Sequence, residues 1–297
     1  MSKHIIVLAI IVIIFINGCV SDEQQTKAEP LETTPEEEVD VIEPIPTKSS
    51  EPLEKNTQET QSETLTDSGD FKLVYDSIST TEYLGYEQIF KESGLFEEVV
   101  NELNDEIVLP FDVYVVFGEC GTPNALYDPT SKQIKMCYEL IDEIAFDFAE
   151  IAEIEEERGR GIVYTLLFIF YHELGHALIN IHDLPATGRE EDAVDQLSTI
   201  ILLEADEKGE EAVLYASSWF LSRANKIDFD ESVFADEHAL DAQRFYNLAC
   251  WVYGKNPQTS SYLVEDGYLP EERAERCEAE YTKISNSWDT LLEPYLK

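Results

Sequence analysis

The stretch that decides the fold reads YHELGHA over residues 171–177, and it continues the uncharged run IVYTLLFIFY over residues 162–171. A run of this kind predicts a helix buried in the core of a domain. It is too short to span a membrane, which takes about 20 apolar residues. In a helix, side chains four residues apart lie on one face about 5–6 Å apart, so His172 and His176 can point at the same metal ion.

The spacing H-E-x-x-H predicts zinc chemistry. Two neutral imidazoles hold Zn²⁺, and Glu173, roughly 100° round the helix from His172, can take a proton from a water on the metal. Two histidines and a glutamate are costly to bury without partners; the alternative is that hydrogen bonds in the core satisfy both histidines. We therefore expect a zinc hydrolase, usually a peptidase, with Glu173 as the general base.

A catalytic zinc normally has three protein ligands and one open position, so a third ligand must come from elsewhere in the chain. His182 has the spacing of the metzincin pattern H-E-x-x-H-x-x-G-x-x-H. However, Ile179 stands where that pattern needs a glycine to turn the chain back to the metal, and no methionine follows for a methionine turn. We therefore expect His182 at the surface end of the helix, where positive charge is favoured.

Glu191 is the stronger candidate for the third ligand. Glu191 and Asp195 share one face of a second helix, and the loop at 184–188 can bring that helix back against the first. The spacing resembles the E-x-x-x-D element of gluzincins, which implies that Glu191 binds zinc and that Asp195 fixes the orientation of the first histidine. Glu190 or Asp192 is the alternative ligand, and an exposed acidic helix start is the alternative structure.

The N-terminus predicts export and a lipid anchor. A basic start precedes an apolar run at 5–16, and a small residue precedes Cys19, as in a secretory signal. INGC at 16–19 resembles the lipobox of prokaryotic lipoproteins, which implies a signal peptide over residues 1–18 and lipidation of Cys19. An uncleaved membrane anchor is the alternative. In either case we expect the protein outside the cytoplasm, anchored to the cell membrane.

Residues 19–70 are predicted to form a disordered acidic tether. Residues 20–70 hold fifteen acidic residues against three lysines, five prolines and no aromatic residue, so they cannot bury enough apolar surface to offset the entropy of ordering. The folded domain is expected over residues 71–297. The net charge of −42 excludes nucleic acid as a natural partner and disfavours anionic lipid surfaces, so the membrane should be reached through the lipid.

The remaining cysteines predict two disulfides. Without Cys19, four cysteines are left, which is an even number for an oxidising compartment. Pairing neighbours in sequence gives Cys120–Cys137 and Cys250–Cys277. Buried free thiols are the alternative.

The predicted fold class is α+β and mostly helical: a zincin-like metallopeptidase with a small antiparallel strand pair packed on an active-site helix. Strands are expected at 71–75, 111–117 and 133–137. The strands at 111–117 and 133–137 are expected to form the antiparallel pair, and the Cys120–Cys137 disulfide would link them. Helices are expected at 83–104 with a break near Gly94, and at 139–157, 161–181, 190–206, 209–224, 235–253 and 270–292.

Several motifs together resemble a prokaryotic family of zinc metallopeptidases whose substrate is not established. They are CGTPNALYDP at 120–129, YHELGHAL at 171–178, LPATGREEDAVDQL at 184–197 and DEHALDAQRFYNLACWVYG at 236–254. The resemblance covers roughly residues 71–295. It implies a secreted, gluzincin-like enzyme that uses Zn²⁺ and acts on a peptide or protein substrate.

A local likeness suggests where a substrate would bind. NALY at 124–127 is similar to the edge strand of thermolysin-like peptidases, which pairs with the substrate backbone. That likeness implies substrate contacts by Asn124, Ala125 and Tyr127. The alternative is a turn in which Asn124 bonds to its own backbone.

The oxyanion of the reaction needs a donor that faces the metal. Gluzincins often use a downstream histidine or tyrosine, which implies His238, on a predicted helical stretch, in this role. Arg244 and Tyr246 are the alternative candidates for this hydrogen-bond donor. Arg244 could equally anchor an internal salt bridge.

These expectations combine into a lipid-anchored extracytoplasmic zinc metallopeptidase. The main rival is a non-catalytic lipoprotein that binds a partner at the cell surface and uses zinc as a structural staple, for which four protein ligands are expected. A zinc amidase or other non-peptide hydrolase is a third possibility, because the motif alone does not separate it from a peptidase.

Overall fold

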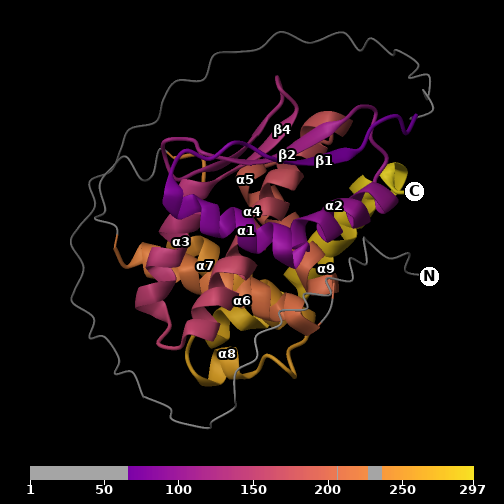
Figure 1. Cartoon of the computed structure of the whole chain (residues 1–297). Helices are drawn as coiled ribbons and strands as arrows, with labels where there is room; N and C mark the ends of the chain where they lie inside the picture. The colour runs from indigo at the N-terminus through magenta and orange to yellow at the C-terminus, as the bar shows by residue number, and fades with distance from the viewer. Residues whose placement is uncertain (1–65, 206, 227–235) are drawn as a thin grey trace, which may run out of the picture. The chain divides into compact units, whose positions relative to one another are not determined.

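The computed structural model describes residues 66–205, 207–226 and 236–297 (Figure 1). The predicted signal peptide, Cys19 and residues 19–65 of the predicted tether lie outside the described residues. The strands are β1 (Phe71–Tyr75), β2 (Val113–Gly118), β3 (Ala125–Asp128) and β4 (Gln133–Cys137). The α-helices of the described part are α1 (Leu84–Ser93), α2 (Leu95–Glu106), α3 (Tyr138–Ile151), α4 (Glu155–His182), α5 (Glu190–Ala205), α6 (Glu207–Ala224), α7 (Asp241–Lys255), α8 (Tyr262–Glu265) and α9 (Glu271–Leu292).

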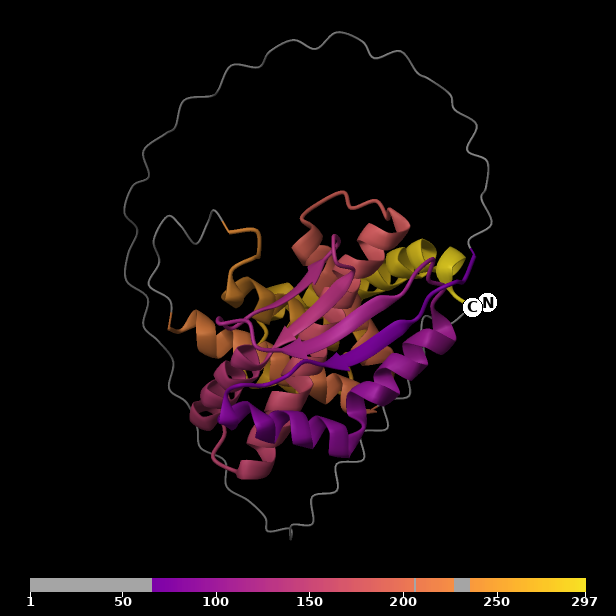
Figure 2. The same cartoon turned by 45° about the horizontal axis from the view of Figure 1, so that its top comes forward.

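The strands form one mixed sheet in the order β1-β2-β4-β3. β1 and β4 run parallel to β2, and β3 runs antiparallel to β4 at the edge. Alternate residues of a strand point to the same face, and one face is closed by fully buried side chains: Val113, Val115, Phe117, Ile134 and Met136. Figure 2 shows the sheet lying across one side of the helices, and none of the described helices covers its other face.

The predicted antiparallel pairing of residues 111–117 with residues 133–137 is wrong. β2 and β4 are parallel neighbours, with Tyr114 opposite Gln133. The connection at 119–132 is long enough to carry the chain back along the sheet before β4 begins. It contains β3, and β3 and β4 form the antiparallel pair instead.

α4 is the centre of the helical layer. It packs against α3, α5 and α6 and against β3 and β4, and nearly all of its residues from Tyr164 to Leu178 are buried. Within the described part, α4 alone is long and apolar enough to cross a membrane, yet 78% of its most apolar window is buried inside the protein. This agrees with the predicted core helix.

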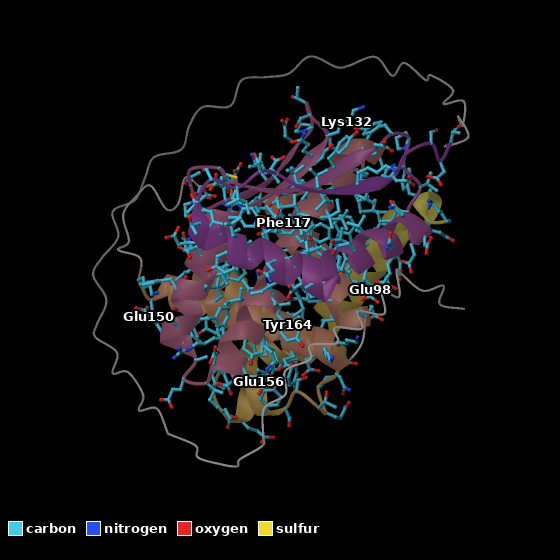
Figure 3. The ribbon with its side chains drawn as sticks, viewed as in Figure 1. Glu98, Phe117, Lys132, Glu150, Glu156 and Tyr164 are labelled. Atoms are coloured by element: carbon cyan, nitrogen blue, oxygen red, sulfur yellow. A yellow bond between two sulfur atoms is a disulfide. The ribbon has the colours of Figure 1, made fainter. Side chains whose placement is uncertain are left out.

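A chain of aromatic rings fixes α4 beneath the sheet. Phe117 of β2 lies with its ring centroid 4.6 Å from that of Phe96 in α2, and Phe96 lies 5.9 Å from Phe170 of α4. Figure 3 shows Phe117 between the sheet and the helices. Such ring pairs stabilise a fold by about 0.5–1.5 kcal/mol each beyond the area that they bury.

α4 begins at Glu155, earlier than the predicted start at 161. Gly159 and Gly161 therefore both lie inside the helix. A Cβ at Gly161 would lie 2.4 Å from the ring of Phe148. Gly161 is therefore explained by the close approach of α3 to α4, not by a helix end.

Two further expectations agree with the structure. Gly94, with a left-handed φ of 68°, separates α1 from α2. The disulfides Cys120–Cys137 and Cys250–Cys277 are both formed. The second joins α7 to α9, where Gly254 allows close contact, because a Cβ there would lie 2.2 Å from the backbone oxygen of Cys277.

Candidate metal centre

α4 and α5 bring the predicted ligands together because the two helices touch at Gly175. A Cβ at Gly175 would lie 2.7 Å from Val194 Cγ1, so a larger residue would push the helices apart. His172 and Glu173 are buried on α4, with 4% and 6% of their surface exposed. The first turn of α5, which carries Glu191, therefore lies against the H-E-x-x-H turn.

Three imidazoles surround the Glu191 carboxylate. The Nε2 atoms of His172 and His238 lie 3.1 and 3.0 Å from Glu191 Oε2, and His176 Nε2 lies 3.3 Å from Oε1. Zinc bonds of about 2.0–2.1 Å in a tetrahedron place two donors about 3.3 Å apart, so these separations suit the donors of one zinc ion. His172, Glu191 and His238 offer donor atoms within 4.8 Å of one another, and His176 is not in that set.

The other ring nitrogen of each histidine is tied to a carboxylate. The Nδ1 contacts are His172 with Asp195 at 2.7 Å, His176 with Glu190 at 2.8 Å and His238 with Asp236 at 3.1 Å. A carboxylate at Nδ1 selects the tautomer that leaves Nε2 free for a metal. Asp195 lies where a residue that orients the first histidine would lie, and the contacts of Glu190 and Asp236 with Nδ1 are not predicted from the sequence.

Arg244 of α7 anchors Asp195. Its Nε and Nη2 atoms donate to the two carboxylate oxygens at 2.8 and 2.7 Å, and its guanidinium lies 3.9 Å from the ring centroid of Phe220. Burial acts to raise the pKa of Asp195, but the Arg244 charge and the hydrogen bonds with His172 and Arg244 together more than offset this, and the pKa falls to about 2. Arg244 thus forms the internal salt bridge that was one of its two predicted roles.

The carboxylates also govern the charge of the histidines. Burial acts to lower the pKa of His176, but its hydrogen bonds to Glu191 and Glu190 raise the pKa to about 9. The hydrogen bond to Glu191 raises the pKa of His238. Despite burial, the same contacts hold the pKa of Glu191 below its ordinary value. Such a concentration of ionised carboxylate favours a bound cation.

Glu173 lies between α4 and β3. Burial raises the pKa of its carboxyl, and the backbone N–H of Tyr127 in β3 donates a hydrogen bond to it. A carboxylate with a raised pKa beside a metal centre is suited to accept a proton and hold it.

The predicted edge strand is present as β3. The backbone oxygen of Asn124 accepts the N–H of Cys137 in β4. Because bonding alternates along an antiparallel pair, the N–H and C=O groups of Ala125 and Tyr127 face away from β4. This arrangement favours the edge strand over the alternative turn.

Two cavities flank the centre and share His172, Glu173 and His238. The first, of about 370 Å³, is lined by residues of α3, α4 and α6 and by residues 236–244 leading into α7, and its apolar side chains include Leu140, Ile169, Trp219 and Phe220. The second, of about 340 Å³, follows β3 and is acidic, with Glu190, Glu191 and Glu237 in its lining. Asn124 and Ala125 border both cavities, and Tyr127 borders the second.

His238 lies before α7 and not on it, contrary to the prediction. α7 begins at Asp241 instead of 235. Asp236 accepts the backbone N–H of His238 at 2.8 Å, which is a turn and not a helix. This turn, together with a bond from Arg189 Nη1 to the backbone oxygen of His238, directs the imidazole at Glu191. Tyr246 is 42% exposed.

His182 is buried, although it was expected at the surface. Only 7% of its surface is exposed, and its ring stacks on Tyr295 at a centroid distance of 4.0 Å. The bridge between Ile107 and Leu296 brings the C-terminal residues across this helix end and covers it. Among the described residues, the donor group around Glu191 does not include His182.

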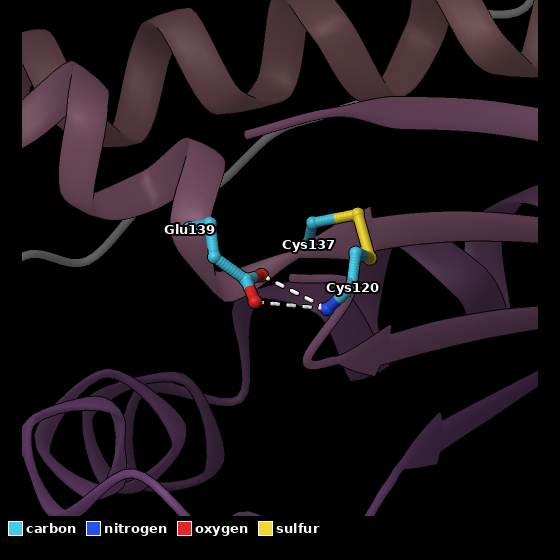
Figure 4. A group of neighbouring side chains, drawn as sticks. All are labelled: Cys120, Cys137 and Glu139. Carbon is cyan, nitrogen blue, oxygen red and sulfur yellow. Dashed lines mark hydrogen bonds between the residues drawn. A yellow bond between two sulfur atoms is a disulfide. The ribbon is translucent and has the colours of Figure 1, made fainter. Parts of the chain in front are cut away.

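A second group of potential metal donors consists of Cys120, Cys137 and Glu139. Figure 4 shows that the two sulfurs form a disulfide, so they are not free to bind a metal. The Glu139 carboxylate accepts the backbone N–H groups of Cys120 at 3.0 Å and of Gly121 at 2.6 Å. These bonds and the disulfide hold the loop that leads into β3.

Comparison with known proteins agrees with a metal-dependent peptidase at the level of the family. No curated protein and no solved structure matches the chain. A family profile described as "Putative metallopeptidase" matches residues 75–292, which include every residue of the centre. The chain therefore belongs to this metallopeptidase family.

Proposed function

We propose that the protein is a zinc-dependent peptidase of the gluzincin type, anchored outside the cytoplasm by a lipid on Cys19. The observation that carries the proposal is the convergence of imidazoles on Glu191 with the Glu173 carboxyl beside them. Imidazole nitrogen and carboxylate oxygen are donors that suit zinc. His172, His176 and Glu191 would hold the ion.

A Zn²⁺ ion held by these residues would polarise the scissile carbonyl and lower the pKa of a water molecule. Glu173 accepts a proton from the attacking water on its carboxylate. Because burial raises the pKa of this carboxyl, it can hold the proton until the amine leaves and takes it. Asp195, itself held by Arg244, keeps the His172 imidazole in place.

The open edge of β3 would bind the substrate as an added strand. The outward N–H and C=O of Ala125 are available for backbone hydrogen bonds, which do not depend on the substrate side chains. Substrate side chains would then enter the 370 Å³ cavity, which has both apolar and charged walls, on one side of the centre and the acidic cavity on the other. His238 Nε2 points at the same centre and would donate to the developing oxyanion.

Glu173→Gln tests the general base. We expect the variant to keep about one zinc per molecule and to lose peptidase activity by about 10²–10⁴-fold, because glutamine accepts no proton. Zinc is measured by mass spectrometry, and activity by cleavage of a mixed peptide library with the full chain in detergent. Glu156→Gln is the matched control, since Glu156 is exposed in the first turn of α4 (Figure 3). This substitution should change neither zinc content nor peptidase activity. Full activity with zinc retained in Glu173→Gln would disprove the mechanism.

Glu191→Ala tests the third ligand. Loss of the carboxylate that contacts the imidazoles should abolish zinc binding at equimolar metal, because two histidines alone do not make a catalytic zinc site. Zinc binding equal to that of the wild type would remove Glu191 from the ligand set.

A non-catalytic zinc lipoprotein is the second candidate function. It gains support from His238, which supplies a fourth donor at the centre, because structural zinc sites are closed by four protein ligands. Against it, a structural site gives no role to Glu173, a buried carboxyl with a raised pKa. A binding protein would keep its partner in Glu173→Gln, whereas a peptidase would lose its activity.

A further inference from the structure

His238 meets Glu191 as closely as the histidines of the H-E-x-x-H motif do. Its Nε2 lies 3.0 Å from Glu191 Oε2, compared with 3.1 Å for His172 and 3.3 Å for His176. The rings of His238 and His172 are nearly parallel, with a 21° angle between their planes. Among the described residues, His172, Glu191 and His238 offer donor atoms that all lie within 4.8 Å of one another.

His238 is also held in the way that ligand histidines are held. Asp236 lies 3.1 Å from its Nδ1 and accepts its backbone N–H, and Arg189 donates to its backbone oxygen. A carboxylate on one ring nitrogen orients the other nitrogen toward a metal and raises its basicity. His172 and His176 have the same arrangement with Asp195 and Glu190.

We propose that His238 is a fourth protein ligand in the substrate-free protein and that an incoming substrate displaces it. This inference rests on the proposed function, because it concerns the same zinc ion. With His172, His176 and Glu191, the imidazole of His238 completes a four-coordinate shell. The free enzyme is then latent, and the open position needed for the reaction appears only when His238 moves away.

The surroundings of the donors indicate which one is displaced. The side chain of His238 is 42% exposed, whereas those of His172, His176 and Glu191 are 5%, 17% and 14% exposed. The other three are fixed on α4 and α5, which pack tightly at Gly175. His238 instead belongs to the short segment before α7 and borders both cavities of the cleft. A substrate lying in the cleft would therefore meet His238 first.

The coordination shell can be counted without measuring activity. X-ray absorption of the zinc-loaded full chain in detergent should show three imidazoles and no solvent ligand in the wild type, and two imidazoles plus solvent in His238→Ala. His182→Phe is the matched control, since it removes a histidine outside the centre. This variant should keep three imidazole ligands on the zinc. Saturating acetohydroxamate, a small bidentate zinc ligand, should lower the wild-type count from three imidazoles to two. Circular dichroism checks that each variant is folded.

Zinc affinity and cobalt spectra provide an independent readout. His238→Ala should bind zinc at least about tenfold more weakly in competition with a chelator. After replacement of zinc by Co²⁺, azide should change the visible spectrum of His238→Ala at concentrations that leave the wild-type spectrum unchanged.

Three results would overturn the inference or its basis, and they are distinguishable. Two imidazoles with solvent in the wild type, unchanged in His238→Ala, would disprove ligation by His238 and leave the proposed peptidase intact. Three imidazoles that persist with bound acetohydroxamate would make His238 a permanent ligand and disprove displacement. A wild-type protein that binds no zinc would overturn the proposed function itself.

Discussion

Burial of His182 has a direct consequence for stability. The residue lies at the end of α4 with 7% of its surface exposed, stacked on Tyr295. Because burial disfavours the charged ring, its pKa falls from 6.5 to about 4. The unfolded chain therefore takes up a proton near pH 6.5, but the folded protein does so only near pH 4. The free energy of unfolding must fall as the pH drops through this range.

His182→Phe should remove this part of the pH dependence, because phenylalanine keeps the stacked ring and cannot be protonated. Between pH 6.5 and pH 4, the wild type should lose up to about 3 kcal/mol more unfolding free energy than the variant. Urea unfolding followed by circular dichroism at a series of pH values measures the difference. Parallel pH profiles for the two proteins would contradict the burial of His182.

Residue identities at the centre were predictable to different degrees. His172, Glu173 and His176 follow from one local motif, and Glu191 and Asp195 from a second helix with the right spacing. The sequence does not reveal the role of Asp236, because the pattern over residues 235–253 predicts one helix, in which side chains two apart do not face each other. The turn at Asp236 and His238 reverses that conclusion.

At the scale of elements, the centre depends on the contact between α4 and α5. Gly175→Ala would place a methyl group 2.7 Å from Val194 and force the helices apart. Overpacking of this kind costs about 1–3 kcal/mol, and it would also shift Glu191 relative to His172. We expect a lower melting temperature and weaker zinc binding, measured by thermal unfolding and chelator competition.

Gly159→Ala is the control within the same helix. A Cβ at Gly159 meets nothing within 4 Å, so the substitution should stabilise the protein by about 0.5–1 kcal/mol and leave zinc binding unchanged. If Gly175→Ala bound zinc as tightly as Gly159→Ala does, the close approach of α4 and α5 would not be what sets the ligand geometry.

Helices were more predictable than the sheet for a physical reason. The apolar spacing within α5 and α9 reports their buried faces directly, and both were placed within a residue or two. The direction of pairing between β2 and β4 depends on where the connection at 119–132 turns back, and no spacing within either strand encodes that. The same limit applies to His182, whose burial depends on C-terminal residues far away in the sequence.

At the scale of the whole molecule, the excess of negative charge is the feature that most affects stability. The net charge is −42, and residues 71–297 carry 47 acidic residues against 16 basic ones. Many basic side chains are already in ion pairs, as Arg244 is with Asp195 and Lys226 is with Asp147. Because acidic residues outnumber basic ones this strongly, most carboxylates have no basic partner of their own, and their mutual repulsion opposes the compact state.

Salt should stabilise the protein by screening this repulsion. The screening length is about 30 Å at 0.01 M salt and about 3 Å at 1 M, so repulsion between surface carboxylates is strong in the first condition and nearly absent in the second. Raising NaCl over this range should increase the melting temperature of the zinc-loaded protein by about 5 °C, equivalent to roughly 1–2 kcal/mol. KCl at equal concentration should act alike, since screening depends on charge and not on the identity of the cation. A melting temperature that stayed flat or fell would mean that the ion pairs, which salt weakens, contribute more to stability than the repulsion among the unpaired carboxylates takes away.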